Sequence, residues 1–112
     1  MGVINNISNK EYIIKIRNDE IDTDVLTGEL NSIIIDSNEY VSVTITSSLG
    51  YLIFHNGQTK GVNYYAPRAL IQGAISNLMV YDQFNKFKLN ESINIRVSGP
   101  ANEDTTIILR ID

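Results

Sequence analysis

Short runs in which β-branched residues alternate with polar ones recur along this chain. Residues 40–46 read Tyr-Val-Ser-Val-Thr-Ile-Thr, so Val41, Val43 and Ile45 share one face and polar side chains share the other. The same alternation occurs at residues 12–16, 93–97 and 107–111. A period of two is the period of a strand with one buried face. The pattern therefore predicts antiparallel strands that turn one face to a core and one to water.

The composition agrees with this pattern, because β-branched residues are enriched in strands. The chain has 18 Ile and 7 Val against 8 Leu in 112 residues, and it contains no Cys. A chain of this length buries enough apolar surface to fold without disulfides or a structural metal. We expect a single domain over residues 1–112, a mainly β fold, with an antiparallel β-sandwich of about six to eight strands.

Two turns are predicted from polar or glycine-containing segments between apolar runs. Asp36–Glu39 separates two β-branched runs and suits a turn of about four residues. Asn56-Gly57 lies between Tyr51–His55 and Gln58–Lys60, and Asn-Gly is typical of a type I′ hairpin turn. Each segment therefore predicts a hairpin.

The period changes between about residues 67 and 79. Leu70, Ala74 and Leu78 form one i, i+4 row, and Ile71, Ile75 and Met79 form the adjacent row. Such rows are typical of an amphipathic helix with one apolar face. Pro67 suits the first turn of a helix, whereas Gly73 disfavours its interior by about 1 kcal/mol relative to Ala. We expect one helix here, packed against the sheet.

The charge of the chain excludes some classes of partner. The formal net charge is -4, and the nine basic residues are scattered singly. Such a domain repels a nucleic-acid backbone, so no nucleic-acid partner is expected. The apolar runs are too short to cross a bilayer and the N-terminus lacks the pattern of a signal peptide, so no membrane partner is expected.

Residues able to carry catalysis or bind a metal are few. His55 is the single histidine and lies beside Asn56-Gly57, where a solvated side chain is the simpler interpretation. Without Cys or further His, a standard zinc site is excluded. Residues 18–29 carry acidic side chains at a spacing that resembles a calcium loop, but Thr23 stands where that loop requires Gly. We expect no enzymatic activity, no cofactor and no metal, and cation binding by residues 18–29 stays open.

Exposed tyrosines are the candidate binding residues. Tyr64 and Tyr65 are adjacent, so in a strand they face opposite sides and one of them is exposed near Arg68. Tyr51 is the third candidate. Tyrosine rings anchor protein interfaces and stack on sugars, so both a protein contact and a carbohydrate contact are considered.

In its size and in the style of its strands, the whole chain resembles small tail-tip or baseplate proteins of siphophages that infect Gram-positive bacteria. The resemblance rests on the strand at residues 40–46, Asn56-Gly57 and the terminal strand at residues 105–111. It implies a β-sandwich similar to the shoulder domain of lactococcal phage receptor-binding proteins. It also implies a place in the virion, assembled in the host cytoplasm, and a scaffolding role in host adsorption. No functional residue is carried over from it.

The expected function is therefore that of a non-enzymatic structural or adaptor protein of a phage tail or baseplate. Its partners would be other virion proteins or further copies of itself, and a host cell-wall glycan is a further candidate. The alternative is a carbohydrate-binding module that uses Tyr64, Tyr65 and Tyr51 together with Arg68.

Overall fold

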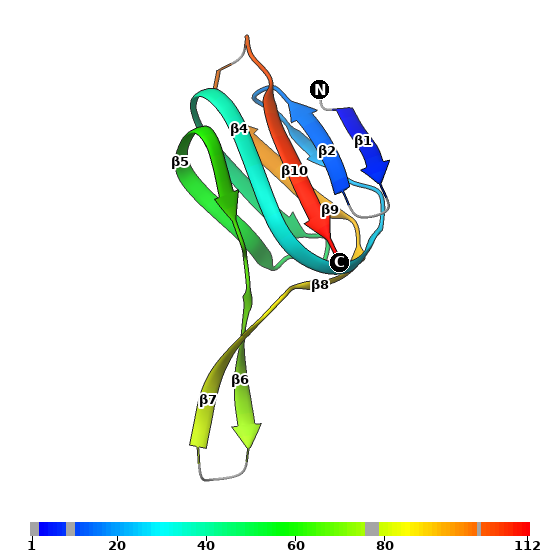
Figure 1. The fold of residues 1–112 in the computed structure, drawn as a ribbon, viewed down its shortest axis with the longest axis vertical. Helices are drawn as coiled ribbons and strands as arrows, with labels where there is room; N and C mark the ends of the chain where they lie inside the picture. The colour runs from blue at the N-terminus through cyan, green and yellow to red at the C-terminus, as the bar shows by residue number, and fades with distance from the viewer. Residues whose placement is uncertain (1–2, 9–10, 76–78, 101) are drawn as a thin grey trace.

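Ten β-strands make up most of the chain in the computed structural model, which describes residues 3–8, 11–75, 79–100 and 102–112 (Figure 1). The strands are β1 (Val3–Ser8), β2 (Glu11–Ile16), β3 (Glu20–Asp22), β4 (Leu26–Ser47), β5 (Leu52–Tyr65), β6 (Ala69–Ile75), β7 (Met79–Asn85), β8 (Lys88–Glu91), β9 (Ile93–Ser98) and β10 (Thr105–Ile111). The described ranges contain no helix, so none there is long and apolar enough to cross a membrane. The predicted mainly β, antiparallel fold is confirmed. The prediction of about six to eight strands in a sandwich is wrong, because the described ranges hold ten strands in one eight-stranded sheet and one two-stranded sheet.

The long strand β4 organises an eight-stranded sheet. β5 pairs with β4 from Ile33 to Thr46, β10 pairs with residues 30–36, and β9 pairs with residues 42–47. Because β5 occupies one edge of β4 along this whole length, β10 and β9 share the other edge, one after the other. β2 and β1 extend the sheet beyond β10, and β3 extends it beyond β9. The sheet curls into a half-barrel (Figure 1).

The core lies inside the curl, where the two halves of the sheet face each other. It consists mainly of Ile and Val from alternate positions of the strands, as the alternation in the sequence predicts. The fully buried members are Ile14, Ile16, Leu30, Ile33, Ile35, Val43, Ile45, Ile93, Ile95, Ile107 and Leu109. Burial of each such side chain stabilises the fold by roughly 1.5–3 kcal/mol before chain entropy is counted.

A β-bulge in β4 keeps two neighbouring segments directed at this core. Arg110 pairs with Ser32 and Ile111 pairs with Leu30, so Asn31 is an extra residue on β4. A bulge changes which face each following residue occupies. Leu30 and Ile33 are therefore both fully buried, although residues three positions apart would face opposite sides of a regular strand.

The turn predicted at Asp36–Glu39 is wrong, because this segment lies inside β4. The Ser37 hydroxyl is buried and donates a hydrogen bond to the Glu39 carbonyl oxygen (2.7 Å). The pairing with β5 shifts register between Ser37 and Val41, so the strand bends here without reversing. The polar residues thus mark a bend in one strand.

The reversal between β4 and β5 occurs further along, at residues 48–51. Gly50 has a φ of +96°, and its N–H donates to the Ser47 carbonyl oxygen (2.9 Å). The type I′ turn predicted at Asn56-Gly57 is also wrong, because both residues lie inside β5. Val41 of β4 pairs with Thr59, and Val43 pairs with Asn56. Over this stretch β5 therefore carries one residue more than β4, which makes a second bulge.

The helix predicted for about residues 67–79 is not formed. Residues 69–75 are strand β6, which pairs antiparallel with β7 from Ala69↔Asn85 to Ile75↔Met79, and residues 76–78 of the prediction lie outside the described ranges. The segment contains Ile71, Ile75 and Gly73, which weaken a helix, and β7 follows as a pairing partner. We name the β6–β7 hairpin the arm. It projects away from the curled sheet (Figure 1).

Candidate functional site

The arm leaves and re-enters the sheet along one edge of β4. β5 ends opposite Ile33, and β8 pairs with β4 from Leu26 to Glu29, so β5 and β8 lie end to end. The Leu30 N–H donates to the Phe87 carbonyl oxygen (2.9 Å), which places the returning chain against β4. The entry and exit of the arm are therefore adjacent.

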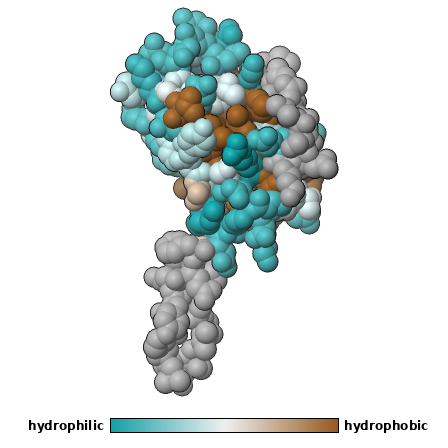
Figure 2. Space-filling model, viewed as in Figure 1, coloured by the Kyte–Doolittle hydropathy of each residue, from teal (hydrophilic) through white to brown (hydrophobic). Residues whose placement is uncertain are grey.

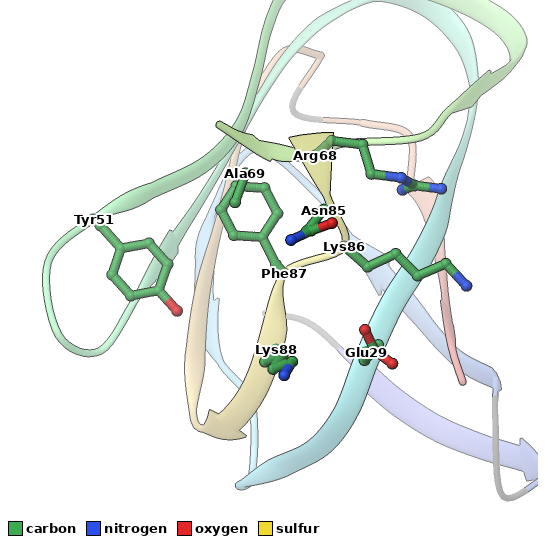
Figure 3. A pocket seen from close by; sticks show the side chains of 8 residues that line it. All are labelled: Glu29, Tyr51, Arg68, Ala69, Asn85, Lys86, Phe87 and Lys88. Carbon is green, nitrogen blue, oxygen red and sulfur yellow. The ribbon is translucent and has the colours of Figure 1, made fainter. Parts of the chain in front are cut away.

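An open pocket of about 870 Å³ lies at this root of the arm (Figure 3). We name it the root pocket. Its lining residues are Glu29, Tyr51, Arg68, Ala69, Asn85, Lys86, Phe87 and Lys88. Its size falls within the range of roughly 300–1,000 Å³ that is usual for small-molecule sites.

One wall of the root pocket is aromatic. The rings of Tyr51 and Phe87 are stacked, with centroids 6.2 Å apart and planes 9° from parallel. The Tyr51 hydroxyl donates to Glu91 Oε1 (2.6 Å), and Ser47 Oγ donates to Glu91 Oε2 (2.5 Å). These bonds connect the β4–β5 turn to the end of β8 and fix the orientation of the Tyr51 ring.

The same bonds shift two pKa values in opposite directions. Burial raises the pKa of the Tyr51 hydroxyl, and the Glu91 carboxylate that accepts its hydrogen bond raises it further. The hydroxyls of Ser47 and Tyr51 lower the pKa of Glu91 by stabilising its charged form. At neutral pH the tyrosine is therefore a neutral donor and the glutamate a charged acceptor.

The other side of the root pocket is cationic. Arg68 Nη1 donates to two backbone carbonyl oxygens, those of Asn31 (3.0 Å) and Pro67 (2.8 Å). The Lys86 ammonium pairs with the Asp112 side chain, and Lys88 lies opposite Glu29 in the β4–β8 register. Figure 3 shows Phe87 between Tyr51 on one side and the Arg68 and Lys86 side chains on the other.

The structure brings two of the four predicted binding residues together. Tyr51 and Arg68 both line the root pocket. Tyr64 lies elsewhere on β5 with 70% of its surface exposed. The adjacent Tyr65 packs its ring against Phe54 (centroids 4.9 Å apart), so the two side chains face opposite sides, as predicted. The four residues do not form one platform.

The Tyr65 hydroxyl is already engaged within the protein. It accepts a hydrogen bond from Asn56 Nδ2 (2.8 Å) and lies 3.0 Å from Thr59 Oγ1. Asn63 Nδ2 donates to Thr59 Oγ1 in turn (2.9 Å). This polar group stabilises the bulged part of β5, and Tyr65 is a structural residue of that group.

Sequence reasoning missed most of the root pocket. Lys86, Phe87 and Lys88 are consecutive, and a cation-aromatic-cation triplet is the one local signal that marks them. Their relation to Tyr51 depends on β8 ending beside the β4–β5 turn. That relation is tertiary, so the triplet alone did not indicate it.

The other residues considered for catalysis or metal binding each interact with a different partner. His55 is exposed, with Nδ1 2.8 Å from Thr44 Oγ1. In the acidic stretch, Asp22 Oδ1 accepts from Asn94 Nδ2 (2.9 Å) and Glu20 pairs with Arg96 (3.3 Å). Within the described ranges, no group of three or more His, Cys, Asp or Glu residues could hold a metal ion.

Comparisons of the chain with protein-family models, with curated proteins and with solved structures return no match.

Proposed function

We propose that this protein is a non-enzymatic structural or adaptor component of a phage tail or baseplate, in the apparatus of host adsorption. The two halves of the curled sheet, packed over one core, would act as a β-sandwich-like scaffold. The phage setting comes from the resemblance to small siphophage tail-tip and baseplate proteins. The adaptor role draws its support from the architecture of the chain.

The observation that carries the adaptor role is the arm. Within the described residues, β6 and β7 pair with each other and with no strand of the eight-stranded sheet. A two-stranded hairpin is at best marginally stable in water by itself. Residues 69–85 nevertheless include ten apolar residues and a single charged one, Asp82. Such a segment gains stability when another protein covers it, and the partner would be another virion protein or a second copy.

A variant without the arm tests this role. Residues 70–84 are replaced by Asn-Gly, so that the Ala69↔Asn85 pair closes a two-residue hairpin. Native mass spectrometry and solution scattering are measured for both proteins, alone and with tail extract from phage of the strain that carries the gene. We expect the full chain to form complexes that the variant does not form. Circular dichroism of the variant checks that the sheet is retained.

The contrary result is equally clear. A full-length protein that is strictly monomeric, binds nothing in the extract and is absent from purified virions would overturn the proposal. Arg96→Gln serves as a surface control, because this exposed side chain lies on β9, away from the arm. It should leave complex formation unchanged.

The carbohydrate-binding alternative is favoured by one observation, the stacked Tyr51 and Phe87 rings beside polar side chains. Aromatic walls with a few polar groups are common in sugar sites. Tyr51→Ala should then abolish the retention of the protein on cell-wall glycans, whereas Tyr64→Ala, outside the root pocket, should not. No retention of the unmodified protein would exclude this alternative.

A further inference from the structure

Arg68 differs from the other arginines in its electrostatic partners. Arg17, Arg96 and Arg110 each contact a carboxylate, those of Asp104, Glu20 and Glu11 respectively. Arg68 instead donates from Nη1 to two backbone carbonyl oxygens. Carbonyl groups hold the guanidinium in place but do not neutralise its charge. Nε and Nη2 have no hydrogen-bond partner among the described residues.

The edge left available on Arg68 has a defined geometry. Nε and Nη2 carry parallel N–H groups, the fork that binds the two oxygens of a carboxylate at once. With Nη1 fixed by Asn31 and Pro67, this fork is held in a half-buried side chain. A pre-oriented fork loses little conformational entropy when it binds.

The charge of the root pocket favours an anion with few negative groups. Lys86 is paired with Asp112, whereas Lys88 forms no ion pair within the described ranges. Glu29 adds a negative charge to the lining. Among the lining side chains, Arg68 and Lys88 therefore exceed Glu29 by one charge, on a chain whose net charge is -4. Glu91 lies outside this lining, and both of its oxygens accept hydrogen bonds from Ser47 and Tyr51. A ligand with one carboxylate matches this excess, and a polyphosphate would be repelled by Glu29.

The aromatic wall and the polar groups indicate the rest of the ligand. A flat ring inserted between Tyr51 and Phe87 requires the centroids of those two rings to lie roughly 7 Å apart, which is twice the usual van der Waals separation. The two centroids lie 6.2 Å apart. A base sandwiched between the two rings is therefore disfavoured. The wall suits the C–H face of a sugar. The Asn85 amide and the Glu29 carboxylate are suitable partners for hydroxyl groups.

We propose that the root pocket binds a carboxylated saccharide, such as a uronic acid, with the carboxylate on the Nε/Nη2 fork of Arg68. Lys88 adds attraction for the same charge, and Phe87, which lies between Tyr51 and Arg68 (Figure 3), contacts the sugar face. This inference gives the carbohydrate-binding alternative a ligand class and is independent of the adaptor role of the arm.

The test uses the full chain labelled with ¹⁵N and the probes glucuronate, glucose and acetate. Amide chemical shifts are followed by NMR during each titration. We expect saturable shifts in residues of the root pocket with glucuronate. Glucose and acetate should each bind at least about tenfold more weakly, because each lacks one of the two recognised groups.

Three variants connect the binding to individual side chains. Arg68→Lys keeps the charge but removes the fork, and it should weaken glucuronate binding about tenfold or more. Lys88→Gln, at an exposed residue that forms no ion pair with the described part of the chain, should weaken it by a smaller factor. Lys60→Gln removes an exposed cation outside the root pocket and should leave the affinity unchanged. Unchanged spectra of the unliganded variants confirm that each one folds.

The outcomes separate this inference from the proposals before it. Equal binding of glucuronate and acetate, or an Arg68→Lys variant with full affinity, would overturn it. Equal binding of glucuronate and glucose would also overturn it, while leaving a neutral-sugar site in place. Absence of pocket shifts with glucuronate would overturn it without affecting arm-dependent assembly, which the arm-deletion variant tests separately.

Discussion

Glu91 connects the β4–β5 turn to the end of β8 by accepting hydrogen bonds from Ser47 and Tyr51. The Ser47 oxygen also accepts from the Leu49 N–H (2.9 Å), so one hydroxyl organises the turn and contacts the carboxylate. Because the network requires a charged Glu91, its contribution to stability depends on pH.

We predict that Glu91→Gln lowers the melting temperature at pH 7 and that the difference narrows in acid. The folded-state pKa of Glu91 lies below its ordinary value of 4.5. A lowered carboxylate pKa stabilises the fold above the pKa of the unfolded chain, and this stabilisation disappears as the pH falls through the folded pKa. Thermal unfolding of the unmodified protein and of the variant, followed by circular dichroism at pH 7 and pH 3, measures the difference in melting temperature. A difference that is equal at both pH values would contradict the role of the charge.

Gly28 illustrates a second constraint at the scale of one residue. Its φ is +132°, and a Cβ built there would lie 2.5 Å from the Asp112 carbonyl oxygen and 2.6 Å from Ile111 Cγ2. That carbonyl oxygen accepts a hydrogen bond from the Glu29 N–H (3.1 Å), so it moves only if the pairing moves. Gly50 has a φ of +96° with open space around the same position.

We predict that Gly28→Ala destabilises the protein more than Gly50→Ala does. Backbone strain alone should cost of order 1–3 kcal/mol at either position. At Gly28 the clash with the end of the chain adds to that strain. Urea denaturation followed by fluorescence gives both free energies of unfolding. Equal losses would show that Ile111 and Asp112 shift without cost to the free energy of unfolding.

At the scale of the element, β10 shows how one strand serves two surfaces. Ile107 is fully buried in the core, whereas Ile108 is half-buried on the outer face. The register places Ile13, Ile108, Ile34 and Tyr64 in one row across β2, β10, β4 and β5. Figure 2 shows apolar atoms on this face surrounded by hydrophilic ones. The outer face is thus partly apolar.

We predict that Ile107→Ala lowers the free energy of unfolding by about 2–5 kcal/mol, the range for a truncation that leaves a core cavity. Ile108→Ala should cost about 1 kcal/mol, because its surroundings are already partly hydrated. Chemical denaturation of the two variants provides the comparison. A larger loss at Ile108 than at Ile107 would mean that the inward and outward faces are assigned incorrectly.

At the scale of the whole molecule, the eight-stranded sheet, which we name the body, and the arm differ in how their strands are paired. β4 is paired along both edges over much of its length, while among the described strands β6 and β7 pair only with each other. Local opening free energies follow such differences in buried contact and pairing. The molecule therefore combines one cooperative unit with one weakly supported hairpin.

We predict that amides of β6 and β7 exchange with deuterium much faster than those of β4 and β10 in the isolated protein. Hydrogen exchange read by mass spectrometry measures both regions in one experiment. Protection of the arm should rise when a partner in the tail extract binds it. Equal protection of arm and body in a monomer would contradict the arrangement.

The sequence predicted the fold class and the inward positions because alternation is a local property of each strand. It predicted Val41, Val43 and Ile45 as one buried face, and all three are buried. Turns were predicted less well, because Asp36–Glu39 and Asn56-Gly57 are polar or flexible in sequence yet lie inside paired strands. A polar segment bends, bulges or reverses according to the strand beside it, and that neighbour is distant in sequence.

The candidate site, like the fold, could be predicted from the sequence only in part. Tyr51 and Arg68 could be selected one by one from residue chemistry, but their common pocket exists because β5 and β8 share an edge of β4. The sequence by itself determined that this is an antiparallel β protein with an Ile-rich core, since local period and side-chain type suffice for that. Only the tertiary structure decided that residues 69–85 form an arm and that its root is a pocket, because both depend on which distant strands pair.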